Sequence, residues 1–138
     1  MNVYIDTNIA LDLLLGRAPF DIASKQLFAL ADNGKINLYF SSLSFSTIHY
    51  ILAKQLGKDK AIEVLRKFRL LVNILPIDEK VVDLALNSNF SDFEDAMQYY
   101  CALRNNTEVL LTRNIKDYKN AKMSVMTTDA FVKQLNYK

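Results

Sequence analysis

Short apolar runs rich in β-branched and aromatic residues alternate along this chain with longer segments whose apolar residues recur at helical spacing. The short runs predict strands at 3–5, 36–40, 72–75 and 109–112, with 124–126 as a candidate fifth. The segments between them predict helices at 9–15, 22–31, 44–56, 58–71, 78–86 and 91–104, and a last one from 127 or 128. Strands separated by helices pair in parallel, because the chain crosses back over the sheet before each new strand. The sequence therefore predicts an α/β fold with helices on both faces of a parallel sheet.

Length and composition limit the classes of protein to consider. The chain has 138 residues, so we expect residues 1–138 to form a single domain. The net charge of +2 permits a polyanionic partner without requiring one. The single cysteine, Cys101, excludes an intrachain disulfide, and with one histidine, His49, it cannot supply a structural zinc site. No apolar run has membrane-spanning length and no signal peptide is recognisable, so we expect a cytoplasmic protein without a membrane partner.

Polar side chains follow the first predicted strand directly. Asp6, Thr7 and Asn8 come after Val3-Tyr4-Ile5 and before a helix. In open α/β folds, ligands collect at the carboxyl edge of the sheet, so Asp6 is the first candidate for a functional carboxylate. All three residue types also cap helices well, which is the alternative explanation for them.

Three further segments place polar residues after a strand or at a helix start, at 41–47, 91–95 and 112–117. In a parallel sheet these segments can meet at one edge. Asp92 and Asp95 lie three apart on one helix face. Ser91 and Glu94 fit a capping box, so we interpret Glu94 as a cap, and Asp92 could simply favour the helix dipole. Asp95, one turn inside the helix, is harder to explain structurally.

Asp6, Asp95 and Asp117 would repel one another if the fold brought them together. Two carboxylates about 4 Å apart repel by roughly 4 kcal/mol at an effective dielectric near 20. A cation is needed, and an all-oxygen ligand set favours Mg²⁺ or Mn²⁺. Such an ion suits phosphodiester hydrolysis, in which it activates water and neutralises the phosphate. The alternative is that the acids lie on separate loops.

Three motifs taken together resemble the PIN domain family, and most closely its small VapC-like toxins. The motifs are Asp6-Thr7-Asn8, Asp92-Phe93-Glu94-Asp95-Ala96 and Thr112-Arg113-Asn114-Ile115-Lys116-Asp117-Tyr118. The resemblance implies a three-layer α/β/α fold with a four- or five-stranded parallel sheet and a Mg²⁺- or Mn²⁺-dependent endoribonuclease. It also implies a homodimer held inactive by a cognate antitoxin. The implied metal carboxylates are Asp6, Asp95 and Asp117, with Asp92 as a companion. The supporting polar groups are Thr7, Asn8, Thr47, Thr112 and Asn114.

The chain departs from the family pattern at one position. The family usually carries a glutamate in the helix after its second strand, where this chain has Thr47, and no acid occurs between Lys35 and Gly57. Either Asp92 or Asp12 substitutes, or the activity is weakened. A catalytically degenerate PIN-like module that binds RNA or protein is therefore the alternative function, and structured DNA is a weaker alternative substrate.

Two basic residues lie within the late polar segment. Arg113 and Lys116 are interpreted as RNA phosphate contacts, although solvated helix faces explain most other lysines and arginines. With only three glycines the chain can build neither a P-loop nor a dinucleotide-binding fingerprint.

Overall fold

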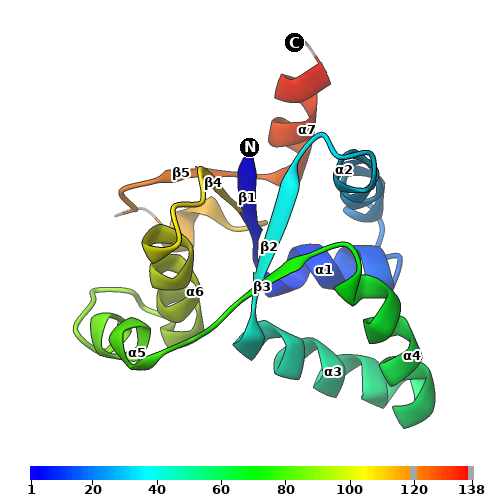
Figure 1. Ribbon diagram of the computed structural model, residues 1–138, viewed down its shortest axis with the longest axis horizontal. Helices are drawn as coiled ribbons and strands as arrows, with labels where there is room; N and C mark the ends of the chain where they lie inside the picture. Colours follow the sequence, from blue (N-terminus) through cyan, green and yellow to red (C-terminus); the bar gives the residue numbers. More distant parts are fainter. Residues whose placement is uncertain (119–120, 137–138) are drawn as a thin grey trace.

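The computed structural model describes residues 1–118 and 121–136. Its strands form one five-stranded sheet in the order β3-β2-β1-β4-β5, and every pair is parallel (Figure 1). The strands are β1 (Asn2–Ile5), β2 (Asn37–Ser41), β3 (Asn73–Leu75), β4 (Val109–Leu111) and β5 (Ser124–Met126). The predicted parallel sheet is confirmed, and 124–126 is its fifth strand.

Helices cover both faces of the sheet, which confirms the three-layer α/β/α fold (Figure 1). The helices are α1 (Thr7–Leu14), α2 (Asp21–Asp32), α3 (Ser42–Leu56), α4 (Lys58–Arg69), α5 (Glu79–Leu86), α6 (Phe93–Arg104) and α7 (Thr128–Asn136), with a 3₁₀ turn η1 (Ile115–Tyr118). Helices α5 and α6 pack on one face, and α1, α2, α3, α4 and α7 pack on the other. Within the described residues, no helix is both long and apolar enough to cross a bilayer.

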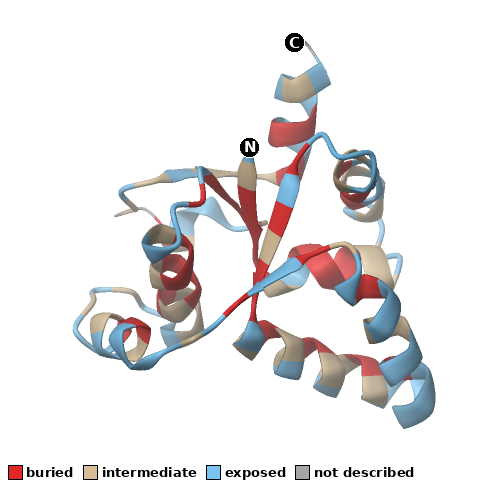
Figure 2. Ribbon diagram, viewed as in Figure 1, coloured by how far each residue is buried: buried red, intermediate tan, exposed pale blue. Residues whose placement is uncertain are grey.

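The central strand β1 is buried on both faces (Figure 2). Val3 and Ile5 point into the core beneath α1 and α2, whereas Tyr4 points into the smaller core beneath α6. This division follows from the strand period of two, which sends successive side chains to opposite faces. Because both faces of such a strand are buried, consecutive residues are apolar, as Val3, Tyr4 and Ile5 of β1 are.

The strand order places a topological switch point beside β1. The chain runs from β1 outward to β2 and β3, then returns to the other side of β1 to form β4 and β5. The connections after β1 and β4 therefore leave their strands in opposite directions, and a crevice opens between the carboxyl ends of these two strands. Ile5 pairs with Leu111 in register, so Asp6 and Thr112 follow adjacent strands at the same level.

Two predicted helix starts are wrong by a few residues. Ser41, not Ser44, caps α3, and its Oγ accepts the Ser44 amide at 3.0 Å. Asp92, not Ser91, caps α6, and its Oδ1 accepts the Asp95 amide at 2.9 Å. In both cases the residue with extended backbone angles immediately before the helix is the cap, because its side chain points back at the free amides. The predicted capping box of Ser91 with Glu94 is therefore incorrect.

Candidate functional site

Asp6 lies at the switch point, directly after β1, and its side chain is 5% exposed. Its Oδ1 accepts the amides of Asn8 at 3.0 Å and Ile9 at 3.4 Å, so it caps α1. Its Oδ2 accepts the Thr112 hydroxyl at 2.6 Å, which joins the carboxyl ends of β1 and β4. Burial raises the pKa of Asp6 to about 6, although these hydrogen bonds oppose the shift. Asp6 therefore caps α1 with one oxygen while its other oxygen contacts Thr112.

The other predicted carboxylates act electrostatically on Asp95, which lies on the first turn of α6. Burial raises the pKa of Asp95 to about 7, and the negative charges of Asp92, Asp6 and Asp117 raise it further. The Tyr118 hydroxyl donates to Asp95 Oδ1 at 3.3 Å. Burial and the charges of Asp6 and Asp95 in turn raise the pKa of that phenol. Acids that follow β1, begin α6 and lie in η1 thus share one electrostatic environment.

A network of polar side chains links α1, α3 and α6 beneath these acids. The Thr7 hydroxyl donates to Ser44 Oγ at 3.3 Å and to Glu94 Oε1 at 3.4 Å. Gln98 Oε1 accepts from Ser44 at 3.4 Å and from the Tyr4 hydroxyl at 3.4 Å, and all three of these residues are buried. Thr7 therefore belongs to this network, and its predicted supporting role at the carboxylates stays a prediction.

The sequence analysis missed Glu94, Ser44 and Gln98 as members of this network. Glu94 was assigned to a cap, yet its carboxylate approaches the start of α1. A usable signal was present, because Glu94 and Gln98 are four apart and lie on one face of α6. By contrast, the Thr47 hydroxyl donates to the Leu43 carbonyl of its own helix at 3.4 Å. Ser44, rather than Thr47, is the α3 hydroxyl that the structure joins to the network.

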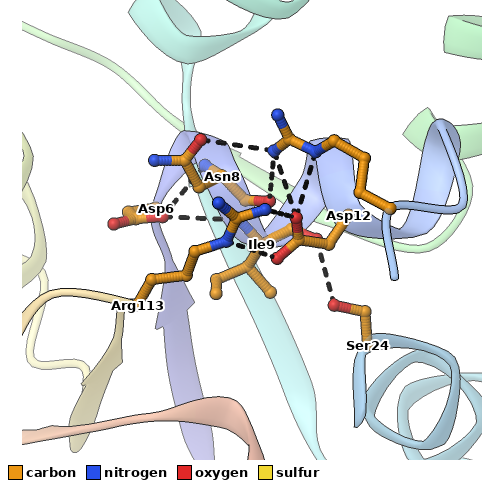
Figure 3. Close-up of polar contacts among 7 residues, drawn as sticks. Asp6, Asn8, Ile9, Asp12, Ser24 and Arg113 are labelled. Carbon is orange, nitrogen blue, oxygen red and sulfur yellow. Dashed lines mark hydrogen bonds and ion pairs between the residues drawn. The ribbon is translucent and has the colours of Figure 1, made fainter. Parts of the chain in front are cut away.

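Asp12 is buried at 1% exposure but is not available as a ligand (Figure 3). Arg113 Nε donates to its Oδ2 at 3.0 Å, and a second Arg113 nitrogen pairs with its Oδ1. Arg17 Nε also donates to Oδ1, at 3.1 Å. The Arg113 guanidinium lies 4.0 Å from the centroid of the Phe20 ring. We name the group of Asp12, Arg17 and Arg113 the Asp12 clamp. Its ion pairs argue against Asp12 as the acid that substitutes for the family glutamate at Thr47. They also argue against the predicted phosphate contact of Arg113.

The remaining predicted residues lie around the rim of the site. Asn8 is exposed, and its Oδ1 accepts from Arg17 at 3.3 Å. Asn114 is exposed, and its backbone N–H donates to the Thr112 hydroxyl oxygen at 3.2 Å. Lys116 is exposed on η1 beside Asp117. Of the two predicted phosphate contacts, Lys116 is the one whose charge faces solvent.

The donor set fits a hard divalent cation chemically. It consists of carboxylate oxygens whose charges raise the pKa of Asp95, and no ion pair to Asp6, Asp92, Asp95 or Asp117 is present among the described residues. In the same part of the chain, no group of three or more acidic, histidine or cysteine side chains is placed to hold a metal ion. The acids therefore influence one another electrostatically, but among the described residues they form no preassembled ligand cage.

This fold and this arrangement of acids define a PIN domain, and the family model for the PIN domain matches residues 2–116. The chain belongs to the PIN domain family. It is 27% identical to ribonuclease VapC1 of Aquifex aeolicus, over 97% of this chain and 95% of that protein.

Two solved structures share the fold. A toxin–antitoxin complex from Klebsiella pneumoniae superposes with a TM-score of 0.69 at 24% identity, over 91% of this chain and 97% of that one. VapC20 of Mycobacterium tuberculosis, described as a sarcin–ricin loop cleaving toxin, gives a TM-score of 0.68 at 13% identity, over 86% and 94%.

Proposed function

We propose that this PIN domain is a metal-dependent endoribonuclease that hydrolyses RNA phosphodiesters with Mg²⁺ or Mn²⁺. The observation that supports it most strongly is that the negative charges of Asp92, Asp6 and Asp117 all raise the pKa of the partly buried Asp95, while Asp6 lies at the switch point. Clustered carboxylates need a cation, and the relative with the ribonuclease name aligns over nearly the whole chain.

Each residue has a defined part in this proposal. Asp6 is held in one orientation by Thr112 and the α1 amides, so it presents a fixed negative charge. The Tyr118 hydroxyl positions Asp95, and Lys116 contacts an RNA phosphate. Asp117 completes the set. A divalent ion held there would supply activation of water and neutralisation of the phosphate charge.

In this proposal, Glu94 takes the acidic role of the family glutamate, whose position is occupied by Thr47 in this chain. Its carboxylate approaches Thr7 from α6, whereas the family glutamate is expected from the helix after β2. The charge is thus provided from the opposite side of the crevice. The absence of an acid between Lys35 and Gly57 therefore does not by itself imply a weakened site.

By analogy with its relatives, we propose that the chain is the toxin of a toxin–antitoxin pair, with a cognate antitoxin as its protein partner. We further propose that it acts in the cytoplasm as a homodimer of single-domain subunits. Growth inhibition on expression, relieved by co-expression of a small protein encoded next to it, would support this part of the proposal.

The proposal is tested by the substitution Asp6→Asn. Asparagine caps a helix as well as aspartate does, so the variant should fold, but it removes a charge from the site. We expect RNA cleavage with Mn²⁺ to fall by roughly 10²-fold or more, the scale seen when one charge-stabilising group is lost. Asp83→Asn, on the exposed surface of α5, is the matched control. Cleavage by Asp6→Asn at the parental rate would refute the mechanism.

A second candidate function is a non-catalytic RNA- or protein-binding module. It is favoured by one observation, the lack of a preassembled ligand group within the described residues. Calorimetric titration with Mn²⁺ separates the two functions, because the nuclease requires a millimolar or tighter site. In the nuclease, Glu94→Gln should weaken that site, whereas the binding module needs no such site at all.

A further inference from the structure

An open pocket of about 640 Å³ has Asp117, one of the predicted metal carboxylates, in its lining. It is bounded by the connection between α5 and α6, by one side of α6 and by the segment around η1. Asp117 and Lys116 are part of its wall. Because Asp117 belongs both to the pocket wall and to the predicted set of metal carboxylates, a ligand bound in the pocket would contact one member of that set.

Apart from Leu103, the apolar part of the pocket lining is aromatic. Phe90, Tyr99 and Tyr100 line it, with ring centroids 4.9 Å apart for Tyr99 and Tyr100 and 5.2 Å for Phe90 and Tyr99. Phe90 also packs on Tyr118 at 5.8 Å, and Tyr118 donates to Asp95. The rings are therefore held in place by the same contacts that position the site.

The rim of the pocket is polar and carries positive charge. Lys116 and Lys122 are both exposed, and neither makes an ion pair within the part of the chain that the structure describes. The amide of Lys122 donates to the Tyr99 hydroxyl at 2.7 Å, which ties one lysine to the aromatic lining. Asn89 and Ser91 add exposed hydrogen-bonding groups on the opposite wall.

We propose that this pocket binds one unpaired nucleotide of the RNA next to the phosphodiester that is cleaved. The base stacks on the aromatic lining at Tyr100, and the adjoining phosphates contact Lys116 and Lys122. Aromatic rings combined with a positively charged path for the backbone are the general means by which proteins hold single strands. The inference rests on the proposed function, since it assigns part of the substrate of the same site.

The same chemistry selects single-stranded or loop RNA over a duplex. A base within a duplex is stacked on both sides and cannot enter a pocket beside its own backbone, whereas an unpaired base can turn outward. An apolar peptide would fit less well, because its burial would remove water from two lysines without giving them a partner.

The test uses the Asp6→Asn protein, whose cleavage we expect to be roughly 10²-fold slower or more, and fluorescence anisotropy of a labelled single-stranded RNA. Tyr100→Leu should weaken binding about fivefold or more, whereas Tyr100→Phe should bind like the parent. Lys122→Gln should lower the slope of log affinity against log salt by about 0.7, the value for one lost phosphate contact on a single strand. An abasic residue scanned through the RNA should weaken binding at one position, and Tyr100→Leu should abolish that effect.

The matched controls lie on α3, away from the pocket, where the ammonium of Lys54 is 4.3 Å from the ring centroid of Tyr50. Tyr50→Leu and Lys54→Gln should change neither the affinity nor the salt slope. Equal effects of the α3 and pocket variants, or no binding to the Asp6→Asn protein, would overturn the subsite. Cleavage of RNA by the parent with no effect of Tyr100→Leu would overturn the subsite alone. A position-specific abasic effect in a parent that never cleaves RNA would overturn the nuclease proposal alone.

Discussion

Burial and, after it, the charges of Asp92, Asp6 and Asp117 raise the pKa of Asp95, whereas the hydrogen bond from Tyr118 lowers it. Its pKa is raised from 3.8 to about 7 in the folded protein. Between these values the folded protein binds more protons than the unfolded chain, so the free energy of unfolding falls as pH rises. We expect the metal-free protein in EDTA to melt at a lower temperature at pH 8 than at pH 5.

The Asp95→Asn variant tests the source of that pH dependence. It removes the titrating group, so its melting temperature should fall less between pH 5 and pH 8 than that of the parent. Asp83→Asn, exposed on α5, should behave like the parent. If Asp95→Asn retained the full pH dependence, the repulsion would have to be located elsewhere.

Asp12 is the other buried acid near the site, and its role is structural. Removing its charge leaves Arg17 and Arg113 without their shared partner. The two guanidinium side chains are 34% and 29% exposed, so we expect Asp12→Asn to lower the free energy of unfolding by about 2–3 kcal/mol, less than for a fully buried pair. Asp129→Asn, which breaks an exposed pair with Lys133, should cost less than about 1 kcal/mol in urea unfolding. Equal losses for the two variants would contradict a structural role for the Asp12 clamp.

Single residues could be predicted from the sequence where a strand end fixed their position. Asp6 and Thr112 follow strands at the same register, so their meeting follows from the parallel sheet alone. The pairing of Arg113 with Asp12 could not be predicted, because it joins residues 101 apart through side-chain directions that no spacing records. For Glu94, the four-residue spacing to Gln98 could have indicated a shared helix face, but its contact with Thr7 of α1 could not be predicted from spacing.

At the scale of elements, the start of α6 combines two tasks in Asp92. It caps the helix through the Asp95 amide, and its charge raises the pKa of the Asp95 carboxyl. The substitutions Asp92→Asn and Asp92→Ala separate these tasks. Asn keeps the cap, so its stability should match the parent, whereas Ala should cost about 1 kcal/mol. Both should weaken Mn²⁺ binding in calorimetry; parental Mn²⁺ affinity in Asp92→Asn would leave Asp92 as a cap only.

Helices and strands as elements were largely predictable, and their first residues were not. The periodicity of apolar residues predicted the strands and long helices, because burial on one face requires it. The caps of α3 and α6 depended on where the backbone turns, and several serines and aspartates compete for that position at residues 41–44 and 91–95. The 3₁₀ turn η1 was read only as a polar segment, since its four residues are too few to show a period.

At the scale of the molecule, the proposed ion connects parts of the chain that are distant in sequence. Asp6 follows the central strand, Asp95 lies on a helix of one layer, and Asp117 lies in η1 after β4. A ligand that binds only the folded state stabilises the whole fold, by about 2.7 kcal/mol at one hundred times its dissociation constant. For a chain of this length, Mn²⁺ at that concentration should raise the melting temperature by roughly 8–12 °C.

Two variants decide where that stabilisation originates. Asp6→Asn should lose the Mn²⁺-dependent rise, because it removes a ligand, while Asp83→Asn should keep it. A rise that survives in Asp6→Asn would place the ion away from the switch point and so separate metal binding from the acids. If millimolar Mn²⁺ did not raise the melting temperature of the parent, the binding module would be favoured instead. The acids would then repel one another without binding a cation, and they would serve a purpose other than hydrolysis.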